Sequence, residues 1–450
     1  MANSKLTRTP SSTGNRQIHT ISAWVKRSKI NYDYAYILTA GTYNSTQMVQ
    51  LKWDSDNHLI YSGYNAGGGQ EFRLESSKAY RDINGWYNVV VACDSTQGTA
   101  SNRVKIYVNN EQVTAFDEAS YPSSSYDSAL NSQIIHTIGL RDGTSSYFEG
   151  YMSHVAVVDG TALTPATFGE TDSTSGIWKF KGPSGVTWGT NGFHLKFENS
   201  ANLGLDSSGQ TNNFTVAGNL KQAIDNPSNV YSTLNELARV NNFDQRYVEH
   251  LHGNTTAQGT STTNNGNSYS TIGVDSGKWY CEVKINGVYN SIYPTVGFIS
   301  EDNASHSSYT QIGYTASGTG GYKPDGEKLI NGSGSSYGAS FTAGDIIGIA
   351  LDMDNGACYF SKNGVYQDSG DPTSGASKTG AAFSFTPDQF YFVGTSPYRS
   401  ESSVSFNFGN GFFGTTAITS AGSNGNGSLF EYDCPTGYYA LNTKNLNTYG

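Results

Sequence analysis

Short segments in which apolar and polar residues alternate recur along the chain. From residue 103 to 108 (RVKIYV) every second residue is aliphatic, which places these side chains on one face of a β-strand. Residues 86–93 (WYNVVVAC) form a more continuous apolar run of strand length. Asn109 and Asn110 follow the alternating segment, and asparagine tolerates the positive φ that tight hairpin turns require. The pattern predicts a strand, a loop, a second strand, a tight turn and a returning strand.

The second half of the chain repeats this arrangement. Residues 345–351 (DIIGIAL) predict a strand, residues 352–356 (DMDNG) a turn, and residues 357–361 (ACYFS) the next strand. Asn363 and Gly364 then form the dipeptide with the strongest preference for a short hairpin turn. Because one such meander lies in each half, we predict two β-sandwiches in tandem.

Composition agrees with an all-β protein. The chain has 450 residues, of which 52 are Gly and 31 are Tyr, and only 14% are charged. Glycine favours turns and tyrosine favours half-buried strands. We place the first sandwich at 1–220, a linker at 221–244, the second sandwich at 245–415 and a C-terminal segment at 416–450. Residues 234–240, within the linker, are where we expect a short helix.

The charge pattern argues against two classes of partner. The formal net charge is −10 and no Lys/Arg cluster supplies the basic footprint of a nucleic-acid binder, so nucleic acid is not expected. No apolar run approaches the ~20 residues that span a bilayer, so membrane insertion is not expected. Residues 1–8 lack the apolar stretch of a signal peptide, so we expect the chain either to act in the cytosol or to leave the cell by another route, such as release inside a lytic particle.

The four cysteines are too sparse for a disulfide framework. No two of them have the spacing of a zinc or redox motif, and we predict four buried free thiols. They are Cys93, Cys281, Cys358 and Cys434.

Several segments of the first half resemble laminin-G-like domains, which are concanavalin-type sandwiches. The matching segments are 6–10 (LTRTP), 22–27 (SAWVKR), 86–91 (WYNVVV), 103–109 (RVKIYVN), 148–155 (FEGYMSHV) and 206–214 (DSSGQTNNF). The resemblance implies a concanavalin-like jelly roll for this half of the chain.

The second half is similar to SPRY domains, which have the same class of fold. The matching segments are 276–283 (SGKWYCEV), 296–298 (VGF), 312–314 (IGY), 344–352 (GDIIGIALD), 359–365 (YFSKNGV) and 404–409 (VSFNFG). The resemblance implies a second concanavalin-like jelly roll.

The pairing of these two modules resembles marine bacteriophage structural proteins, as do residues 159–170 (DGTALTPATFGE) and 439–446 (YALNTKNL). This resemblance implies a non-catalytic virion protein, a tail fibre or a head fibre or decoration, that attaches to a host-surface glycan or protein. Its partners would be other virion proteins and further copies of itself. Its location would be the virion surface, after assembly in the host cytoplasm. The first module begins almost at Met1, so an N-terminal anchoring domain is not evident. The alternative is a cellular extracellular adhesin or carbohydrate-binding module.

Some concanavalin-type sandwiches are glycanases with three carboxylates at alternate positions of one strand. Two partial matches occur here: Asp352 with Asp354, and Glu431 with Asp433. Neither pair is followed by a third carboxylate, so a turn is the favoured interpretation. We therefore expect no catalytic residues and no enzyme activity.

No cofactor is expected, and two kinds of metal site are alternatives. Laminin-G-like domains sometimes bind Ca²⁺ through loop oxygens, and the aspartates that such a site could use are Asp54, Asp56, Asp142, Asp159 and Asp206. His250 and His252 lie at i and i+2, the spacing with which three copies could hold a transition metal on a threefold axis. A solvated surface pair is the favoured interpretation of these histidines.

Tyrosines near loops rich in Gly and Ser are the candidate ligand-binding residues. Tyrosine offers a rigid contact surface with a polar tip, and binding residues are concentrated in loops. The candidates are Tyr61, Tyr64, Tyr309, Tyr314, Tyr322 and Tyr337.

Overall fold

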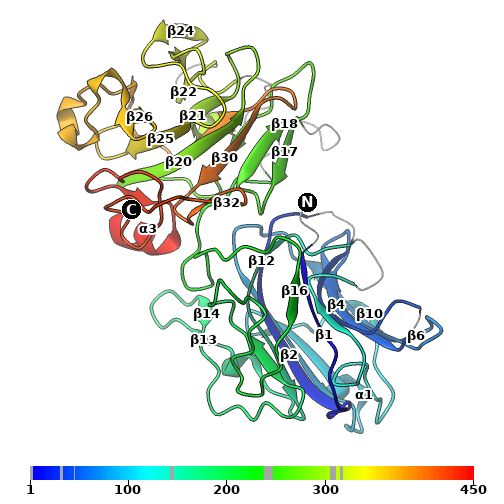
Figure 1. Ribbon diagram of the computed structural model, residues 1–450. Coiled ribbons are helices and arrows are strands. Elements are labelled where there is room, and N and C mark those ends of the chain that lie inside the picture. Colours follow the sequence, from blue (N-terminus) through cyan, green and yellow to red (C-terminus); the bar gives the residue numbers. More distant parts are fainter. Residues whose placement is uncertain are drawn as a thin grey trace. The chain divides into compact units, whose positions relative to one another are not determined.

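The computed structural model describes residues 4–30, 34–44, 46–141, 146–237, 247–304, 311–314 and 318–450. The chain divides into two units, Met1–Gln222 and Ala223–Gly450, each described here by itself. Both consist mainly of strands, which confirms the all-β prediction of two jelly-roll sandwiches (Figure 1). Over the described ranges no helix has the length and apolar character needed to cross a membrane.

The first unit contains two antiparallel sheets. The eight-stranded sheet has the order β10 (Phe116–Ser120), β6 (Gln70–Ala79), β5 (His58–Tyr64), β4 (Met48–Trp53), β3 (Ala35–Ala40), β11 (His136–Ile138), β1 (Lys5–Arg8), β16 (Thr215–Ala217). The six-stranded sheet has the order β15 (Phe193–Leu195), β12 (Gly150–Asp159), β2 (Ile18–Arg27), β7 (Tyr87–Asp94), β8 (Val104–Val108), β9 (Glu111–Gln112). The predicted meander is confirmed as β7–β8–β9, with positive φ at Asn109 and Asn110.

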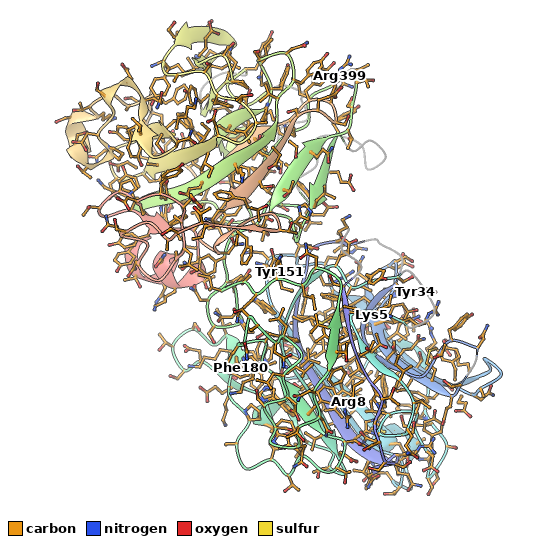
Figure 2. All side chains as sticks on the ribbon, in the orientation of Figure 1. Lys5, Arg8, Tyr34, Tyr151, Phe180 and Arg399 are labelled. Atoms are coloured by element: carbon orange, nitrogen blue, oxygen red, sulfur yellow. The ribbon has the colours of Figure 1, made fainter. Side chains whose placement is uncertain are left out.

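Alternation along the strands builds the core of the first unit. Val104, Ile106 and Val108 all point inward from β8, and Leu59 and Tyr61 point inward from β5. Each large apolar side chain that is fully buried stabilises the fold by about 1.5–3 kcal/mol relative to leaving it exposed. Side chains fill the space between the sheets (Figure 2).

The outer faces of the two sheets differ. A hairpin of β13 (Gly169–Thr171) and β14 (Trp178–Phe180) lies on the six-stranded sheet, where Trp178 donates a hydrogen bond to Asn88 of β7. Phe180 stacks on His154 of β12 at 3.6 Å between ring centroids. By contrast, β6 and β10 carry charged side chains on their outer face, beside β5, and these are partly exposed to solvent.

The second unit is also a two-sheet sandwich. One sheet has the order β17 (Val248–Leu251), β18 (Thr256–Gly259), β30 (Ser403–Asn407), β20 (Lys278–Gly287), β25 (Ile346–Asp352), β26 (Ala357–Lys362), β27 (Val365–Tyr366), with β28 (Phe383–Ser384) on β26 and β33 (Tyr439–Ala440) on β20. The other has the order β19 (Ser268–Tyr269), β29 (Tyr391–Ser396), β21 (Thr295–Ser300), β22 (Thr319–Tyr322), β23 (Glu327–Ile330), β24 (Ser333–Ser336). The predicted meander is β25–β26–β27, with its turn at Asn363 and Gly364.

The segments expected to lie between and after the sandwiches pack into the second unit. Tyr231 and Leu234, from the expected linker, are 2% and 0% exposed and belong to its hydrophobic clusters. Residues 234–237 are not helical, which corrects the expected helix, and residues 238–246 lie outside the described residues. The C-terminal segment buries Phe430 and Tyr438 against the outer face of β20 and β26 and ends in helix α3 (Thr443–Tyr449).

The cysteine prediction is confirmed. All four thiols are buried and free. Burial raises the pKa of Cys93 to about 12, so this thiol stays protonated and serves as a small apolar group.

Candidate functional site

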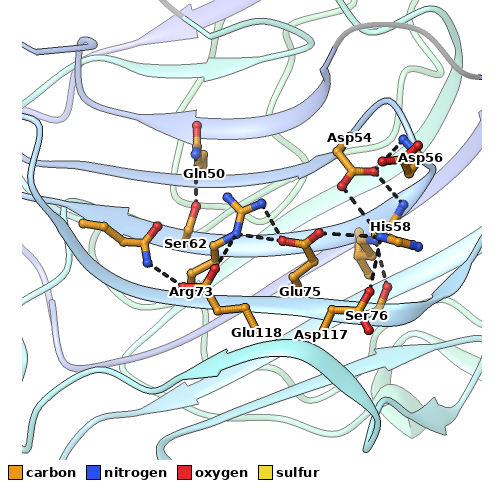
Figure 3. Close-up of polar contacts among 12 residues, drawn as sticks. Gln50, Asp54, Asp56, His58, Ser62, Arg73, Glu75, Ser76, Asp117 and Glu118 are labelled. Carbon is orange, nitrogen blue, oxygen red and sulfur yellow. Dashed lines mark hydrogen bonds and ion pairs between the residues drawn. The ribbon is translucent and has the colours of Figure 1, made fainter.

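The charged outer face of β6 and β10, with the adjoining face of β5, lies at an edge of the eight-stranded sheet, because β10 is the last strand in the order of that sheet. The pairing register places Arg73 beside Ser62 of β5, and Glu75 beside both Ile60 of β5 and Glu118 of β10. Residues that pair across neighbouring strands share one face, so these side chains meet on the outside of the sheet. Figure 3 shows the resulting network of polar contacts.

Arg73 holds the centre of the network. Its Nε and Nη2 donate to Glu75 Oε2 at 2.8 and 2.5 Å, and its Nε lies 3.2 Å from Glu118 Oε2. Gln70 Nε2 donates to Glu118 Oε1 at 2.6 Å. Burial alone would lower the pKa of Arg73, but the hydrogen bond and charge of Glu75 raise that pKa above its ordinary value. The guanidinium therefore remains charged, and its contacts with the two carboxylates hold it in place.

His58 lies at the other end of the network, where three carboxylates face its ring. Its Nδ1 is 3.5 Å from Glu75 Oε1, 3.7 Å from Asp117 Oδ2 and 3.8 Å from Asp54 Oδ2 (Figure 3). Asp54, His58 and Glu75 each offer one ligand atom, and these atoms lie within 4.8 Å of one another. Nitrogen and carboxylate oxygen are ligands of divalent transition metals, so this group is able to hold a metal ion.

The network is accessible to solvent. The Asp117 and Glu118 side chains are 52% and 42% exposed, and that of Arg73 is 18% exposed. Tyr64, which pairs in register with Gln70, is half-buried at the same edge, and its phenol raises the pKa of Arg73. One face thus combines N–H donors, carboxylate acceptors and an aromatic ring.

Two domain families match the chain. Residues 2–167 match the concanavalin A-like lectin/glucanases superfamily, and residues 278–411 match the SPRY domain. The chain carries a concanavalin A-like domain followed by a SPRY domain. Such lectin-like folds indicate a binding role. No curated protein matches the chain significantly.

Solved structures from several organisms match part of the chain. The SPRY domain of human HERC1 is 20% identical, with a TM-score of 0.29, and the match covers 36% of this chain and 92% of that one. A putative carbohydrate binding protein from Bacteroides ovatus ATCC 8483 is 18% identical, with a TM-score of 0.34, covering 50% and 59% of the two chains. The SAP-like pentraxin from Limulus polyphemus is 14% identical, with a TM-score of 0.30, covering 48% and 88%.

The tyrosines predicted from the sequence lie in different environments. In the concanavalin A-like domain Tyr64 borders the charged network, whereas Tyr61 is 1% exposed and its hydroxyl bonds to His19 in the core. In the SPRY domain Tyr322 and Tyr337 are 0% and 8% exposed and pack edge to face at 5.5 Å. These three buried side chains offer no surface to an external ligand, which corrects their assignment as binding residues.

Of the two remaining tyrosines, Tyr314 is 56% exposed. Tyr309 lies outside the described residues. Tyr64, Tyr309 and Tyr314 therefore stay predictions.

The aspartates proposed for Ca²⁺ mostly hold loops together. Asp206 accepts backbone N–H groups of His194 and Ser208 at 2.9 and 2.8 Å, and Asp159 accepts those of Asn15 and Asn191 at 2.7 and 2.9 Å. Carboxylates whose oxygens accept backbone hydrogen bonds in this way stabilise the conformation of the loops. The other candidates are Asp54, which belongs to the charged network, Asp56, which is exposed in the turn after it, and Asp142, which lies outside the described residues.

The two histidines at i and i+2 do not form a surface pair. His250 is 5% exposed, and its ring nitrogens bond to Glu236 at 2.7 Å and Ser268 at 2.6 Å. His252 follows the end of β17, has a positive φ and bonds to Thr256. The expectation of a solvated pair is wrong for His250, because both of its ring nitrogens are engaged in hydrogen bonds inside the second unit.

The carboxylates of the partial glycanase pattern hold turns and loops of the second unit in place. Asp352 accepts from the backbone and side chain of Asn355 and pairs with Lys278 at 3.0 Å. Asp354 accepts the backbone N–H of Gly277. In the C-terminal segment Glu431 accepts the backbone N–H of Thr419, and Asp433 that of Ser423.

The sequence alone indicated few residues of the charged network. Asp54 and Tyr64 were candidates. The sequence did not indicate His58, Arg73 and Glu75, or Asp117 and Glu118 of β10. The alternation of Arg73 and Glu75 with inward Phe72 and Leu74 is a usable signal. Its significance depends on β10 lying next to β6, which only the sheet order reveals.

A second cluster missed from the sequence lies in the SPRY domain. Tyr398 packs on Tyr289 and Tyr293, at 5.4 and 5.1 Å between ring centroids. The guanidinium of Arg399, labelled in Figure 2, lies 4.9 Å from the Tyr289 ring centroid. The three tyrosines are half-buried, so they present ring surface to solvent.

Proposed function

We propose that the protein is a non-catalytic glycan-binding protein, and that the concanavalin A-like domain binds sugar on the charged face around Arg73. The observation that carries this proposal is the grouping of Arg73, Glu118, Gln70 and Tyr64 on one accessible edge of the sheet. The match to a lectin-containing superfamily supports the same class of ligand.

The chemistry of these side chains suits vicinal hydroxyl groups. An ionised carboxylate accepts hydrogen bonds on both oxygens, and a guanidinium donates through a planar fork. Glu118 and Arg73 already contact each other, so little conformational entropy is lost when a ligand binds. The Tyr64 ring supplies apolar surface for the C–H face of a sugar.

The biological setting is the second part of the proposal. The resemblance of the paired modules to bacteriophage structural proteins supports a virion appendage, a tail fibre or a head fibre or decoration, that attaches to the host surface. In such an assembly several copies act together, and multivalency raises the avidity of a weak sugar site by about 10²–10⁴. The rival setting is a cellular adhesin or carbohydrate-binding module.

The binding proposal is tested on an array of bacterial surface glycans with the protein displayed in multivalent form. Arg73→Ala, Glu118→Gln and Tyr64→Ala should each weaken binding about tenfold or more, equivalent to about 1.4 kcal/mol. The matched control is Arg81→Ala, which removes an exposed arginine of the same domain outside the network. Binding that is unchanged in all three variants would overturn the site, and release of reducing ends would overturn the non-catalytic role.

The setting is tested by locating the chain with an antibody. Labelling of purified phage particles is the expected result. Labelling of the cell surface in the absence of particles would favour the adhesin.

A further inference from the structure

We propose that Asp54, His58 and Glu75 form a binding site for a divalent transition-metal ion of the zinc class, with Asp117 as an additional carboxylate. The inference goes beyond glycan binding and does not depend on it. It rests on the positions of the ligand atoms, on the way each carboxylate is held, and on the local charge.

The distances fit coordination better than direct hydrogen bonding. The three carboxylate oxygens lie 3.5, 3.7 and 3.8 Å from His58 Nδ1, beyond the 2.7–3.2 Å of ordinary N–H···O bonds. Zinc bonds to histidine nitrogen and carboxylate oxygen are about 2.0–2.2 Å, so a tetrahedral ion places neighbouring ligand atoms about 3.3–3.6 Å apart. Small side-chain movements bring the observed distances into this range.

The Asp54 carboxylate is held with one oxygen directed to the site. Its Oδ1 accepts the backbone N–H groups of Asp56 at 3.0 Å and His58 at 2.8 Å. The turn is closed by Asn57, whose φ of 72° asparagine adopts readily. Oδ2 is the oxygen that faces the His58 ring, so the turn that carries the histidine also orients the first carboxylate.

The Glu75 carboxylate is held in the same manner by a different group. Its Oε2 accepts from both Nε and Nη2 of Arg73, while its Oε1 faces His58. Metal ligands in proteins are commonly fixed by such outer hydrogen bonds, which set their direction before the ion arrives. Asp54 thus lies in the turn after β4 and Glu75 lies on β6, yet each presents one oxygen to a common ring nitrogen.

The local charge favours a cation. Three carboxylates surround one imidazole, and two guanidinium groups act on them: Arg73 bonds to Glu75, and the charge of Arg27 interacts with Asp54. Side-chain exposures of 10%, 20% and 17% for Asp54, His58 and Glu75 place the ligand atoms where water screens this repulsion incompletely. A divalent ion relieves the repulsion and stabilises the domain by binding only its folded state.

The ligand types identify the class of ion. One imidazole nitrogen with two or three carboxylate oxygens is a set that zinc and its first-row neighbours accept. Calcium prefers six to eight oxygens, and imidazole is not among its usual ligands. Asp54, His58 and Glu75 supply three ligand atoms, and Asp117 beside them is 52% exposed. A fourth coordination position is therefore open to a water molecule or a further ligand.

The test uses the full chain after treatment with a chelator, titrated first with Co²⁺ and then with Zn²⁺. We expect one equivalent of Co²⁺ to give the strong visible absorption of a four-coordinate ion, and Zn²⁺ to displace it and raise the unfolding temperature of the concanavalin A-like domain. His58→Gln and Glu75→Gln should abolish the absorption. Asp117→Asn, on an exposed edge strand, should weaken Co²⁺ binding about tenfold or more.

Two controls keep the outcomes distinct. His252→Gln removes a partly buried histidine of the SPRY domain and should leave the titration unchanged. Glu118→Gln should weaken glycan binding but not Co²⁺ binding, so failure of one proposal is distinguishable from failure of the other. A chain that takes up no Co²⁺, or that binds it equally after His58→Gln and Asp117→Asn with circular dichroism unchanged, would show that His58 is only an ion-pairing residue.

Discussion

The carboxylate of Glu282 accepts a hydrogen bond at 2.7 Å from the backbone N–H of Tyr432, which lies 150 residues later in the chain. Its other oxygen accepts the N–H of Glu431 at 2.8 Å and the side chain of Asn407 at 3.2 Å. Glu282 is 0% exposed on the outer face of β20. This residue therefore attaches the C-terminal segment to the SPRY sheet.

The Glu282 contact should make the stability of the SPRY domain depend on pH. Burial raises the pKa of Glu282 to about 7, although the hydrogen bonds from Glu431 and Tyr432 lower it in part. Between about pH 4.5 and 7 the folded state binds more protons here than the unfolded state, so this contribution to stability falls as pH rises. The slope reaches at most about 1.4 kcal/mol per pH unit and is measurable by urea unfolding at a series of pH values.

The matched variant is Glu282→Gln, which removes the titration and places an amide N–H₂ against backbone donors. We expect it to lose the pH slope and to destabilise the domain at pH 5 by about 1–3 kcal/mol. An unaltered pH profile in this variant would assign the slope to other groups.

Mild acid should act in the opposite direction on the concanavalin A-like domain. Burial lowers the pKa of His19 and of His136 to about 4, and both side chains are buried. Between pH 6.5 and 4 the unfolded state binds more protons, so each histidine removes up to about 1.4 kcal/mol of stability per pH unit as pH falls. Tryptophan fluorescence reports this loss, because five of the six tryptophans lie in the first unit. Stability that does not decline from pH 6.5 to 4.5 would contradict the prediction.

Two adjacent residues test the role of the C-terminal segment. Phe430 is 1% exposed and packs on Tyr280 at 4.9 Å between ring centroids, whereas Leu429 is 36% exposed. Phe430→Ala should destabilise the SPRY domain by about 3–5 kcal/mol, and Leu429→Ala by less than about 1 kcal/mol. Thermal unfolding of both variants measures the difference. Equal effects would mean that the segment does not cover a core.

Two tyrosines of the SPRY domain distinguish a role in core packing from a role in ligand binding. Tyr322→Ala should cost about 3–5 kcal/mol of stability, because Tyr322 packs against Phe341 and Phe360 at 5.1 and 5.4 Å. Tyr314→Ala should change stability by less than about 0.5 kcal/mol. Denaturant unfolding gives both values, and glycan binding of the stable Tyr314 variant then tests its place in a binding surface.

Much of the fold could be predicted because its signals are local. Alternation in residues 104–108 and the two asparagines after them are sufficient for a strand and a hairpin, since side-chain direction in a strand repeats every two residues. The same periodicity explains why Tyr61 is buried in the core whereas Tyr64 is only half-buried. Tyr61 shares the inward face with Leu59, while Tyr64 shares the outward face with Ser62. The choice of tyrosines near Gly- and Ser-rich loops did not take into account which face of the strand each side chain lies on.

The candidate site could not be predicted, because it depends on neighbours that are distant in the chain. Arg73 and Glu118 are 45 positions apart and meet only because β10 returns to the edge of β6. His58 gains its carboxylates from three different elements, and the spacing of those residues in the chain carries no signature of a ligand set.

By itself the sequence determined the fold class, the presence of two sandwiches and the buried free cysteines, since these follow from periodicity, turn residues and composition acting over short stretches. The order of the two domains followed from the resemblance of its segments to known domains. Tertiary structure alone decided which charges converge on His58, and that Glu282 binds the backbone of the C-terminal segment. The physical reason is that strand periodicity specifies the face on which a side chain lies, whereas strand order and register determine which side chain lies beside it.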